Sequence, residues 1–414
     1  MKNAVVGQSG GPTPVINASL AGVFEAAKRA GIKTVYGMNH GVKGLIDDNL
    51  IDLEEYLDTD LEIELLKRTP SSFLGTCRYK LKDFKEDDSE YKIIFKNLQK
   101  HNIGYLFYIG GNDSMDTIAK LAEYGAEINS DIRFVGVPKT IDNDLAITDH
   151  CPGYGSAAKY VATTMKEIAR DAACYGTPMV TIVEVMGRNA GWLTAASALA
   201  RHDDSEGVDL ICLPEFPFHP DRFIEKVARF QSHKNAVLVA ISEGIRLEDG
   251  RYVCELAGGA GSTDAFGHKN LTGACRYLAD ITEKALKVRC RPVELSVLQR
   301  CAGHLTSRTD IAEAYQCGGA AVLAAIDGET GKTVIMKRVS NTPYQITTAL
   351  APSKLLANAE NKVPLDWIND YHSDMLKPFL DYAMPLIQGE LTPIYVSGLP
   401  YHVGNLDISE RRGK

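Results

Sequence analysis

The stretch that decides the fold class is Tyr105-Leu106-Phe107-Tyr108-Ile109-Gly110-Gly111-Asn112-Asp113-Ser114. Its first five residues form a continuous apolar run, and two glycines close that run. Apolar residues at helical spacing then follow from about residue 115 to residue 124. A buried strand, a Gly-rich turn and an amphipathic helix in this order predict one unit of a parallel sheet that is covered by helices.

The same order of patterns recurs along the chain. Strand-like apolar runs occur at residues 4–7, 133–137, 180–186, 208–213 and 236–241, and helical patterns at residues 16–30, 156–172, 190–202 and 221–231. Such an alternation predicts an α/β fold with doubly wound parallel sheets. Ligands of these sheets bind beyond the carboxyl ends of the strands, so we expect the functional residues directly after each strand.

Composition excludes several classes of protein. The 414 residues contain 45 Lys and Arg against 53 Asp and Glu, a formal charge of −8, which argues against a dedicated nucleic-acid binder. No window approaches the ~18 uninterrupted apolar residues of a membrane span, so no membrane partner is expected. The nine cysteines are odd in number and form no Cys-x-x-Cys pair, which predicts neither a disulfide framework nor a zinc site. Because the N-terminus also lacks a secretory signal, we expect a cytoplasmic location.

Two Gly-rich turns have the features of phosphate-binding sites. Gly10 and Gly11 follow the strand-like run at residues 4–7, and Gly110 and Gly111 follow the run at residues 105–109. Glycines leave backbone N–H groups uncovered, and the helix N-terminus that follows adds unpaired donors and a partial positive charge. Each turn alone is equally compatible with an ordinary helix start, with Asp113 as the capping residue.

Charged residues follow two further strands. The segment Pro138-Lys139-Thr140-Ile141-Asp142-Asn143-Asp144 places two carboxylates and a lysine in a loop, which suits base catalysis, metal binding and phosphate binding. An ordinary turn is the alternative, because Asp and Asn favour turns. Arg188 ends the segment Val183-Glu184-Val185-Met186-Gly187-Arg188, where it could stabilise a transferring group or simply lie at the surface. His150 has no partner at metal-ligand spacing, so we interpret it as a core or surface histidine.

Together these motifs resemble those of the phosphofructokinases. The matching segments lie at residues 10–11, 75–78, 110–114, 140–144, 186–188, 242–244 and 298–300, in the order of that family. The resemblance implies two Rossmann-like lobes with a helical C-terminal extension, and transfer of a phosphoryl group to the 1-hydroxyl of fructose 6-phosphate with Mg²⁺ as cofactor. It also implies that Asp142 is the general base, and an ordinary aspartate would be ionised at pH 7.

The resemblance assigns the remaining site residues. Lys139 and Arg188 join Asp142 in catalysis. The metal contact is Asn112, which stands where most members have Asp, or its neighbour Asp113 takes over part of that role. Diphosphate contacts fall on Gly10, Gly11, Arg78, Gly110, Gly111, Asp113 and Lys139. Sugar-phosphate contacts fall on Thr140, Ile141, Asp142, Asp144, Met186, Gly187, Arg188, Glu243, Arg291 and Arg300. In this family an arginine of the sugar-phosphate site often comes from a neighbouring subunit.

Two positions favour pyrophosphate as the phosphoryl donor. ATP-using members resemble Gly-Gly-Asp-Gly-Ser, with glycine in place of Asp113, and they usually have glycine in place of Lys139. A carboxylate at position 113 would repel the α-phosphate of ATP by about 4 kcal/mol at ~4 Å and an effective dielectric of ~20. The expected function is therefore a reversible, pyrophosphate-dependent 6-phosphofructokinase. The alternatives are an ATP-dependent enzyme and a non-catalytic regulatory homologue.

The expected domain organisation also follows the resemblance. Residues 1–152 with 298–350 would form a diphosphate-binding lobe, residues 153–297 a sugar-phosphate lobe, and residues 351–414 an extension packed on both. Because closed symmetry is the rule among soluble oligomers, a homodimer or homotetramer is expected.

Overall fold

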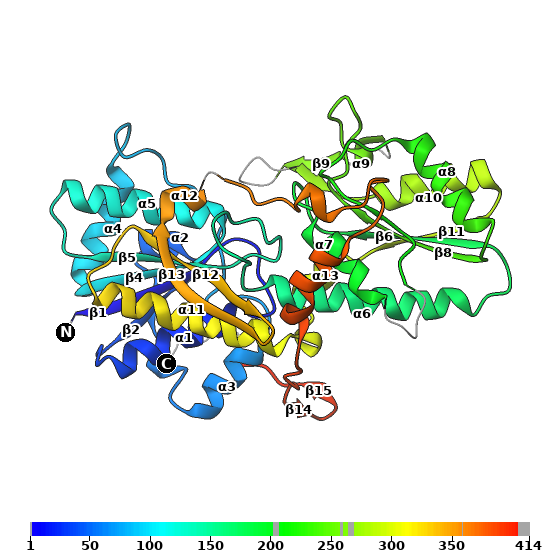
Figure 1. The fold of residues 1–414 in the computed structure, drawn as a ribbon. Helices are drawn as coiled ribbons and strands as arrows, with labels where there is room; N and C mark the ends of the chain where they lie inside the picture. The colour runs from blue at the N-terminus through cyan, green and yellow to red at the C-terminus, as the bar shows by residue number, and fades with distance from the viewer. Residues whose placement is uncertain (1, 202–206, 257–259, 264–268, 358, 405–414) are drawn as a thin grey trace.

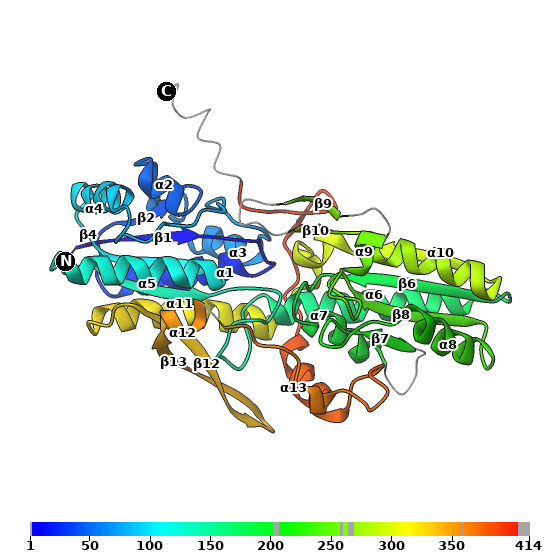
Figure 2. The same cartoon turned by 90° about the horizontal axis from the view of Figure 1, so that it is seen from above.

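The computed structural model describes residues 2–201, 207–256, 260–263, 269–357 and 359–404, and it contains two large β-sheets, each with helices on both faces (Figure 1). Figure 2 shows the two halves side by side along the long axis of the molecule. None of the helices in the described residues combines the length and the apolar character that crossing a bilayer requires.

The first sheet has seven strands. In spatial order they are β13 (Tyr344–Pro352), β12 (Lys332–Asn341), β5 (Arg133–Pro138), β4 (Ile103–Gly110), β1 (Asn3–Gln8), β2 (Val35–Met38) and β3 (Leu50–Asp52). The five central strands are parallel, and β13 and β3 are antiparallel edges. One face carries α1 (Ile16–Arg29), α3 (Asp60–Arg68) and α11 (Arg308–Ile326). The other face carries α2 (Val42–Ile46), α4 (Ser89–Lys100) and α5 (Asn112–Glu127).

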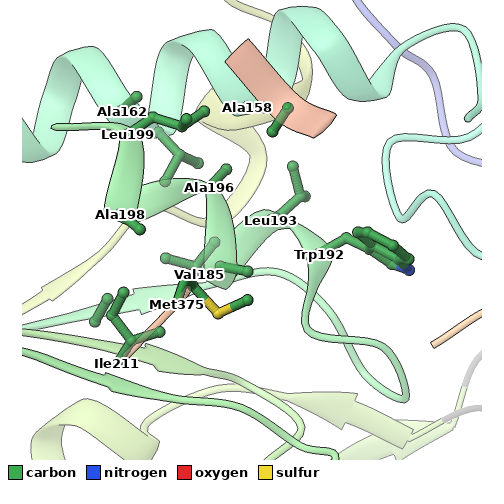
Figure 3. Packing of buried hydrophobic residues seen from close by; sticks show 14 of the residues in the cluster. Ala158, Ala162, Val185, Trp192, Leu193, Ala196, Ala198, Leu199, Ile211 and Met375 are labelled. Atoms are coloured by element: carbon green, nitrogen blue, oxygen red, sulfur yellow. The ribbon is translucent and has the colours of Figure 1, made fainter. Parts of the chain in front are cut away.

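The second sheet has four parallel strands. Their order is β11 (Arg289–Glu294), β6 (Met179–Val185), β8 (Ala236–Ser242) and β7 (Leu210–Cys212). One face packs on α6 (Tyr154–Ala173), α7 (Trp192–Ala195) and η2 (Ala196–Ala200), in the core that Figure 3 shows. The other face packs on α8 (Pro220–Gln231), α9 (Val253–Leu256) and α10 (Ala274–Leu286). A two-stranded ribbon of β9 (Ala260–Thr263) and β10 (Lys269–Leu271) completes this half.

The C-terminal extension consists of short elements. They are α12 (Ser353–Ala357), η5 (Leu365–Trp367), α13 (Lys377–Ala383), η6 (Met384–Ile387) and a hairpin of β14 (Tyr395–Val396) and β15 (Leu399–Pro400). Within the first half η1 (Leu53–Glu55) follows β3, and η3 (Ser296–Arg300) and η4 (Gly303–Leu305) lie in the connection from β11 back to α11 of the first half. Phe379 and Tyr382 of α13 belong to the same apolar core as Trp192, so the extension packs on the second half. Residues 405–414 of the predicted extension lie outside the described residues.

The predicted α/β fold class is confirmed, and each strand and helix expected from the sequence has a counterpart within a few residues. Among the strands of the two large sheets, the pattern missed β2, β3, β11, β12 and β13. In β12 and β13 polar residues interrupt the apolar ones irregularly, so neither a long apolar run nor a regular alternation marks these strands. The strands of residues 1–152 and 332–352 share one sheet and those of residues 179–294 the other. The lobe boundaries themselves stay a prediction.

Candidate active site

The carboxyl ends of strands from both sheets border one cavity of about 660 Å³. Residues directly after β1, β4 and β5 line it from the first sheet, and residues after β6 and β8 line it from the second. A cavity of this size is large enough for a small substrate, and this position is the usual ligand site of doubly wound sheets.

The two Gly-rich turns bring backbone close to the cavity. Gly10 adopts a φ of 76°, and a Cβ atom added there would lie 3.3 Å from Nζ of Lys139. A Cβ atom on Gly11 would lie 3.4 Å from Nη1 of Arg300. The sixteen-residue helix α5 begins directly after the second turn, so its unpaired N–H groups and positive dipole end lie beside the cavity. This arrangement suits an anionic ligand.

Four basic side chains line the cavity: Arg78, Lys139, Arg188 and Arg300. Lys139 is buried and donates a hydrogen bond from Nζ to the carbonyl oxygen of Gly11 at 2.6 Å. Burial lowers the pKa of Lys139 to about 8, although Asp142 and Asp144 oppose this change. Burial and the neighbouring arginines Arg300 and Arg188 also lower the pKa of Arg78. In a chain with a formal charge of −8, this concentration of positive charge indicates a polyanionic ligand.

Five carboxyl groups also line the cavity, those of Asp113, Asp142, Asp144, Glu243 and Glu360. Burial raises the pKa of Asp142, although Arg188 and Lys139 oppose this change. Burial and the charge of Asp142 raise the pKa of Asp144 to about 7 and that of Glu243 to about 8. The expectation of an ordinary pKa for Asp142 is therefore wrong, because the loop lies inside the protein rather than at its surface.

The loop that carries Asp142 and Asp144 is held by the C-terminal extension. Asn143 has a φ of 57° and donates a hydrogen bond from Nδ2 to the hydroxyl of Tyr382 at 2.8 Å. Its Oδ1 accepts a hydrogen bond from the backbone N–H of Cys151 at 2.9 Å. Asn143 is fully buried, so its side chain fixes the turn while its two neighbours face the cavity.

Comparison with known proteins identifies the family. The phosphofructokinase family model matches residues 3–325. The chain belongs to the phosphofructokinase family. The pyrophosphate–fructose 6-phosphate 1-phosphotransferase of Halomonas elongata is 39% identical over 402 residues, which cover 96% of this chain and 94% of that protein. The enzyme of the same name from Methylococcus capsulatus is 39% identical over 97% of this chain and 95% of that protein. The crystal structure of the pyrophosphate-dependent phosphofructokinase from Nitrosospira multiformis is 35% identical, covers 98% of this chain and 97% of its own, and gives a TM-score of 0.88.

Phosphofructokinases generally use a divalent metal ion, and this cavity has oxygen donors that suit one. Oδ1 of Asn112 is buried and accepts no hydrogen bond from any residue that the structure describes. Its Nδ2 lies 3.4 Å from Oδ2 of Asp144. A buried amide oxygen without a hydrogen-bond partner, in a cavity that carboxylates also line, offers the kind of oxygen ligand that a hard cation prefers.

A second group of possible metal ligands lies away from this cavity. Glu184, Cys275 and Glu294 have ligand atoms within 4.8 Å of one another. Oε2 of Glu184 accepts a hydrogen bond from the backbone N–H of Cys275 at 2.9 Å, and Nε of Arg276 donates to Glu294 at 2.6 Å. These contacts explain why the three side chains lie together, because Glu184 caps the first turn of α10.

Three of the site residues predicted from the sequence lie outside the cavity lining: Gly110, Gly187 and Arg291. Gly110 ends β4 directly before the lining residue Gly111. The N–H of Gly187 donates to Oε1 of the lining residue Glu243 at 3.4 Å. Arg291 lies on β11, where Nη1 contacts Oδ2 of Asp171 at 2.5 Å and the guanidinium lies over Tyr175. All other predicted site residues line the cavity.

Sequence reasoning missed several lining residues, among them Ser9, Asn189 and Glu360. Ser9 and Asn189 are neighbours of predicted motifs, so the rule that functional residues follow strands could have included them. Glu360 has no local signal. It comes from the extension, more than two hundred residues after the Asp142 loop, and only the tertiary fold brings it to the cavity.

Proposed function

We propose that this phosphofructokinase transfers a phosphoryl group from pyrophosphate to the 1-hydroxyl of fructose 6-phosphate and releases phosphate and fructose 1,6-bisphosphate. The observation that carries this proposal is the cavity itself, where Asp113 and Lys139 line the same space as the carboxyl of Asp142 and the arginines. The curated relatives that are 39% identical over nearly the whole chain bear the name of this activity. The reaction exchanges one phosphoric anhydride for a phosphate ester, and we expect it to run in both directions.

The diphosphate would bind between the two Gly-rich turns. Gly10, Gly11, Gly110 and Gly111 would offer backbone N–H groups, and Arg78 and Lys139 would offer positive charge. Asp113 lies in the first turn of α5 and lines the cavity, where it would repel the α-phosphate of ATP. An ATP-dependent relative from Corynebacterium efficiens matches with 31% identity over 80% of this chain, against 39% over 96% for the Halomonas elongata enzyme.

In the proposed mechanism Asp142 accepts the proton of the sugar 1-hydroxyl. The hydroxyl oxygen forms a bond to the transferred phosphorus, and the bond from that phosphorus to the bridging oxygen breaks, so that phosphate leaves with its electron pair. The raised pKa of Asp142 brings this base closer to the operating pH, which favours proton transfer. Lys139 and Arg188 would stabilise the charge on the transferring group, as phosphoryl transfer requires.

The remaining predicted contacts belong to the sugar phosphate and the metal. Thr140, Ile141, Asp144, Met186, Gly187 and Glu243 would position the sugar, and Arg300 would hold the 6-phosphate. Mg²⁺ bound by Asn112 and Asp144 would offset the charge of the diphosphate. Arg291 points away from the cavity of its own chain, so we propose that it serves a neighbouring subunit in a cytoplasmic homodimer or homotetramer.

The test is a comparison of phosphoryl donors. Initial rates with fructose 6-phosphate are measured for the wild type and for the double variant Asp113→Gly, Lys139→Gly, with pyrophosphate and with ATP. We expect the wild type to use pyrophosphate and the double variant to lose that activity and gain measurable use of ATP. A wild type that prefers ATP would contradict the assignment of the donor, and a wild type that binds fructose 6-phosphate without turnover would favour a regulatory homologue.

A further inference from the structure

A short segment of the C-terminal extension, residues 359–363, runs along the wall of the cavity, and we refer to it as the strap. Ala359 and Glu360 of the strap line the cavity together with the catalytic loop and Arg188. The family model ends at residue 325, so the strap lies beyond it. The strap therefore adds side chains to the cavity that the family motifs do not supply.

Backbone hydrogen bonds tie the strap to both halves of the site. On one side the N–H of Asn361 donates to the carbonyl oxygen of Asp144 at 2.8 Å, and Glu360 forms an antiparallel bridge with Leu145. On the other side Nε1 of Trp192 donates to the carbonyl oxygen of Asn361 at 2.9 Å. Trp192 is 2% exposed and belongs to the apolar core of the second half, so this anchor is rigid. The strap thus has a fixed position between the catalytic loop and the segment after β6.

The side chain of Glu360 contacts that segment directly. Its Oε1 accepts a hydrogen bond from Nδ2 of Asn189 at 2.7 Å. Oδ1 of Asn189 accepts a second hydrogen bond, from Nη2 of Arg246 at 2.9 Å, and Nη2 of Arg246 also donates to the hydroxyl of Tyr252 at 2.6 Å. Both ends of the Asn189 amide are therefore held, and Asn189 directly follows Arg188 in the sequence.

We propose that Glu360 is a positioning residue for the sugar-phosphate side of the cavity. By fixing the amide of Asn189, it holds the turn of residues 186–190 in the conformation that presents Met186 and Arg188 to the substrate. Charge-assisted hydrogen bonds of this kind are among the stronger ones in proteins, and the backbone bonds of the strap keep the carboxylate in place. This inference rests on the proposed function, because it assigns the turn to the binding of fructose 6-phosphate.

Besides its hydrogen bond to Asn189, Glu360 has an electrostatic effect on the cavity, and the experiment must distinguish the two effects. The charge acts on Asp142 and Asp144 and contributes to the raised pKa of both. The substitution Glu360→Gln keeps an oxygen that can accept from Asn189 and removes the charge. Glu360→Ala removes both. Comparison of the two variants therefore distinguishes positioning from electrostatics.

The experiment measures KM for each substrate and kcat for the wild type, Glu360→Ala, Glu360→Gln, Asn189→Ala and the double variant Glu360→Ala, Asn189→Ala. We expect Glu360→Ala to raise KM for fructose 6-phosphate about tenfold, with KM for pyrophosphate within about twofold of the wild type. We expect KM for fructose 6-phosphate in Glu360→Gln to lie within about threefold of the wild-type value. The double variant should be no worse than the poorer single variant, because both changes remove one interaction.

The matched control is Asp366→Ala, which removes an exposed carboxylate of the same extension that does not line the cavity. Thermal midpoints of all variants check that the fold is intact. Equal defects in Glu360→Gln and Glu360→Ala, or strictly additive effects in the double variant, would overturn the positioning role. If the wild type itself lacks pyrophosphate-dependent turnover, the proposed function fails instead, so the two failures are distinguishable.

Discussion

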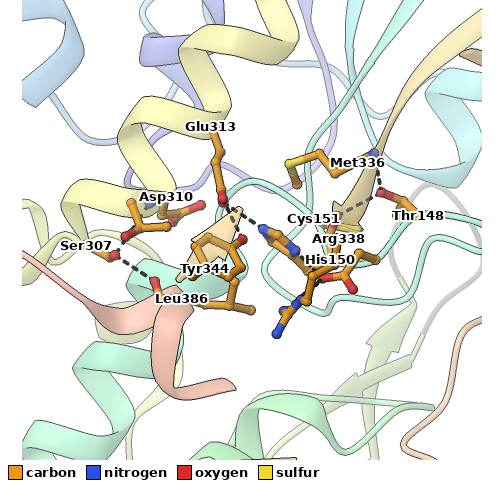
Figure 4. A network of polar contacts seen from close by, with 12 residues as sticks. Thr148, His150, Cys151, Ser307, Asp310, Glu313, Met336, Arg338, Tyr344 and Leu386 are labelled. Atoms are coloured by element: carbon orange, nitrogen blue, oxygen red, sulfur yellow. Dashed lines mark hydrogen bonds and ion pairs between the residues drawn. The ribbon is translucent and has the colours of Figure 1, made fainter. Parts of the chain in front are cut away.

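The loop after β5 contains two groups of partly buried carboxylates that differ in how their charge is balanced. Asp142 and Asp144 face the cavity, and burial raises the pKa of both. Asp149, a few residues later, contacts Nδ1 of His150 at 2.8 Å and Nη2 of Arg338 at 2.9 Å. Figure 4 labels His150 and Arg338 in this network. Burial opposes its ionisation, but these two partners outweigh burial and lower the pKa of Asp149.

His150 links this second group to the rest of the first half. Its Nε2 lies 2.7 Å from Oε2 of Glu313 on α11, and Oε1 of Glu313 accepts a hydrogen bond from the hydroxyl of Tyr344 on β13 at 2.6 Å. Burial acts against the charged imidazolium, but Glu313 and Asp149 outweigh it and raise the pKa of His150 to about 9. The charges around Asp149 are therefore balanced by other residues of the protein. Under the proposed function, the charges of Asp142 and Asp144 are balanced by the substrate, the transferred proton and the metal. Under the proposed function, one short loop therefore serves catalysis at one end and stability at the other.

The largest expected effect concerns the catalytic end. Asp142→Asn keeps the size of the side chain and removes the base, so kcat should fall by about 10²–10⁴-fold. KM for both substrates should change much less, because the loss falls on the transition state. Steady-state kinetics in the direction of fructose 1,6-bisphosphate formation provides the measurement. A variant with near wild-type turnover would end the assignment of Asp142 as the base.

At the structural end the expected effect is on stability. Glu313→Ala leaves His150 with one carboxylate fewer in a fully buried position, and breaking such a buried pair costs about 3–5 kcal/mol. The urea midpoint should drop sharply. Glu329→Ala is the matched control, since its ion pair with Lys332 is exposed and should contribute less than about 1 kcal/mol. Equal midpoints for the two variants would show that the buried network does not stabilise the fold.

The same network predicts a loss of stability at alkaline pH. The pKa of His150 is about 9 in the folded protein against an ordinary value of 6.5, so its contribution is fully present below pH 6.5 and is lost as the pH rises through 9. Thermal midpoints of the wild type and His150→Gln are measured from pH 6 to pH 10. The two curves should converge at the alkaline end. Parallel curves over the whole range would contradict the charged state of His150.

The smallest expected effect concerns the metal. Mg²⁺ at ten times its dissociation constant should stabilise the wild type by about 1.4 kcal/mol, because only the folded chain brings Asn112 and Asp144 together. Asn112→Ala removes the buried oxygen and should weaken this response. The measurement is the thermal midpoint with and without Mg²⁺, with Ca²⁺ as a second cation. An undiminished response to Mg²⁺ in Asn112→Ala would show that other oxygen atoms bind the metal.

The sequence predicted the fold and the place of Asp142 at the cavity for one physical reason. Continuous apolar strands, Gly-rich turns and the residues that follow them are local patterns, and parallel sheets collect their carboxyl ends at one edge. Gly10, Gly111 and Asp142 meet at the cavity because each follows a strand of the same sheet.

The features that the sequence patterns did not indicate depend on contacts between distant parts of the chain. The interpretation of His150 as a core or surface histidine is confirmed for the core, but no local pattern indicates its partner Glu313, which lies on a helix 163 residues later. Glu360 lines the cavity through backbone pairing with the catalytic loop, which its own sequence neighbourhood does not indicate. The raised pKa of Asp142 is likewise a result of burial, and a motif carries no information about depth.

The most direct test of this account compares Asp142→Asn with Asp149→Asn in one set of measurements of kcat and urea midpoint. The two substitutions are chemically identical and lie seven residues apart in one loop. We predict that Asp142→Asn loses about 10³-fold in kcat and keeps its midpoint, whereas Asp149→Asn lowers the midpoint and keeps kcat within about threefold. Two outcomes would contradict the division of this loop into a catalytic and a structural end. One is an equal loss of turnover in both variants, and the other is an Asp142→Asn variant that unfolds at the same lowered urea midpoint as Asp149→Asn.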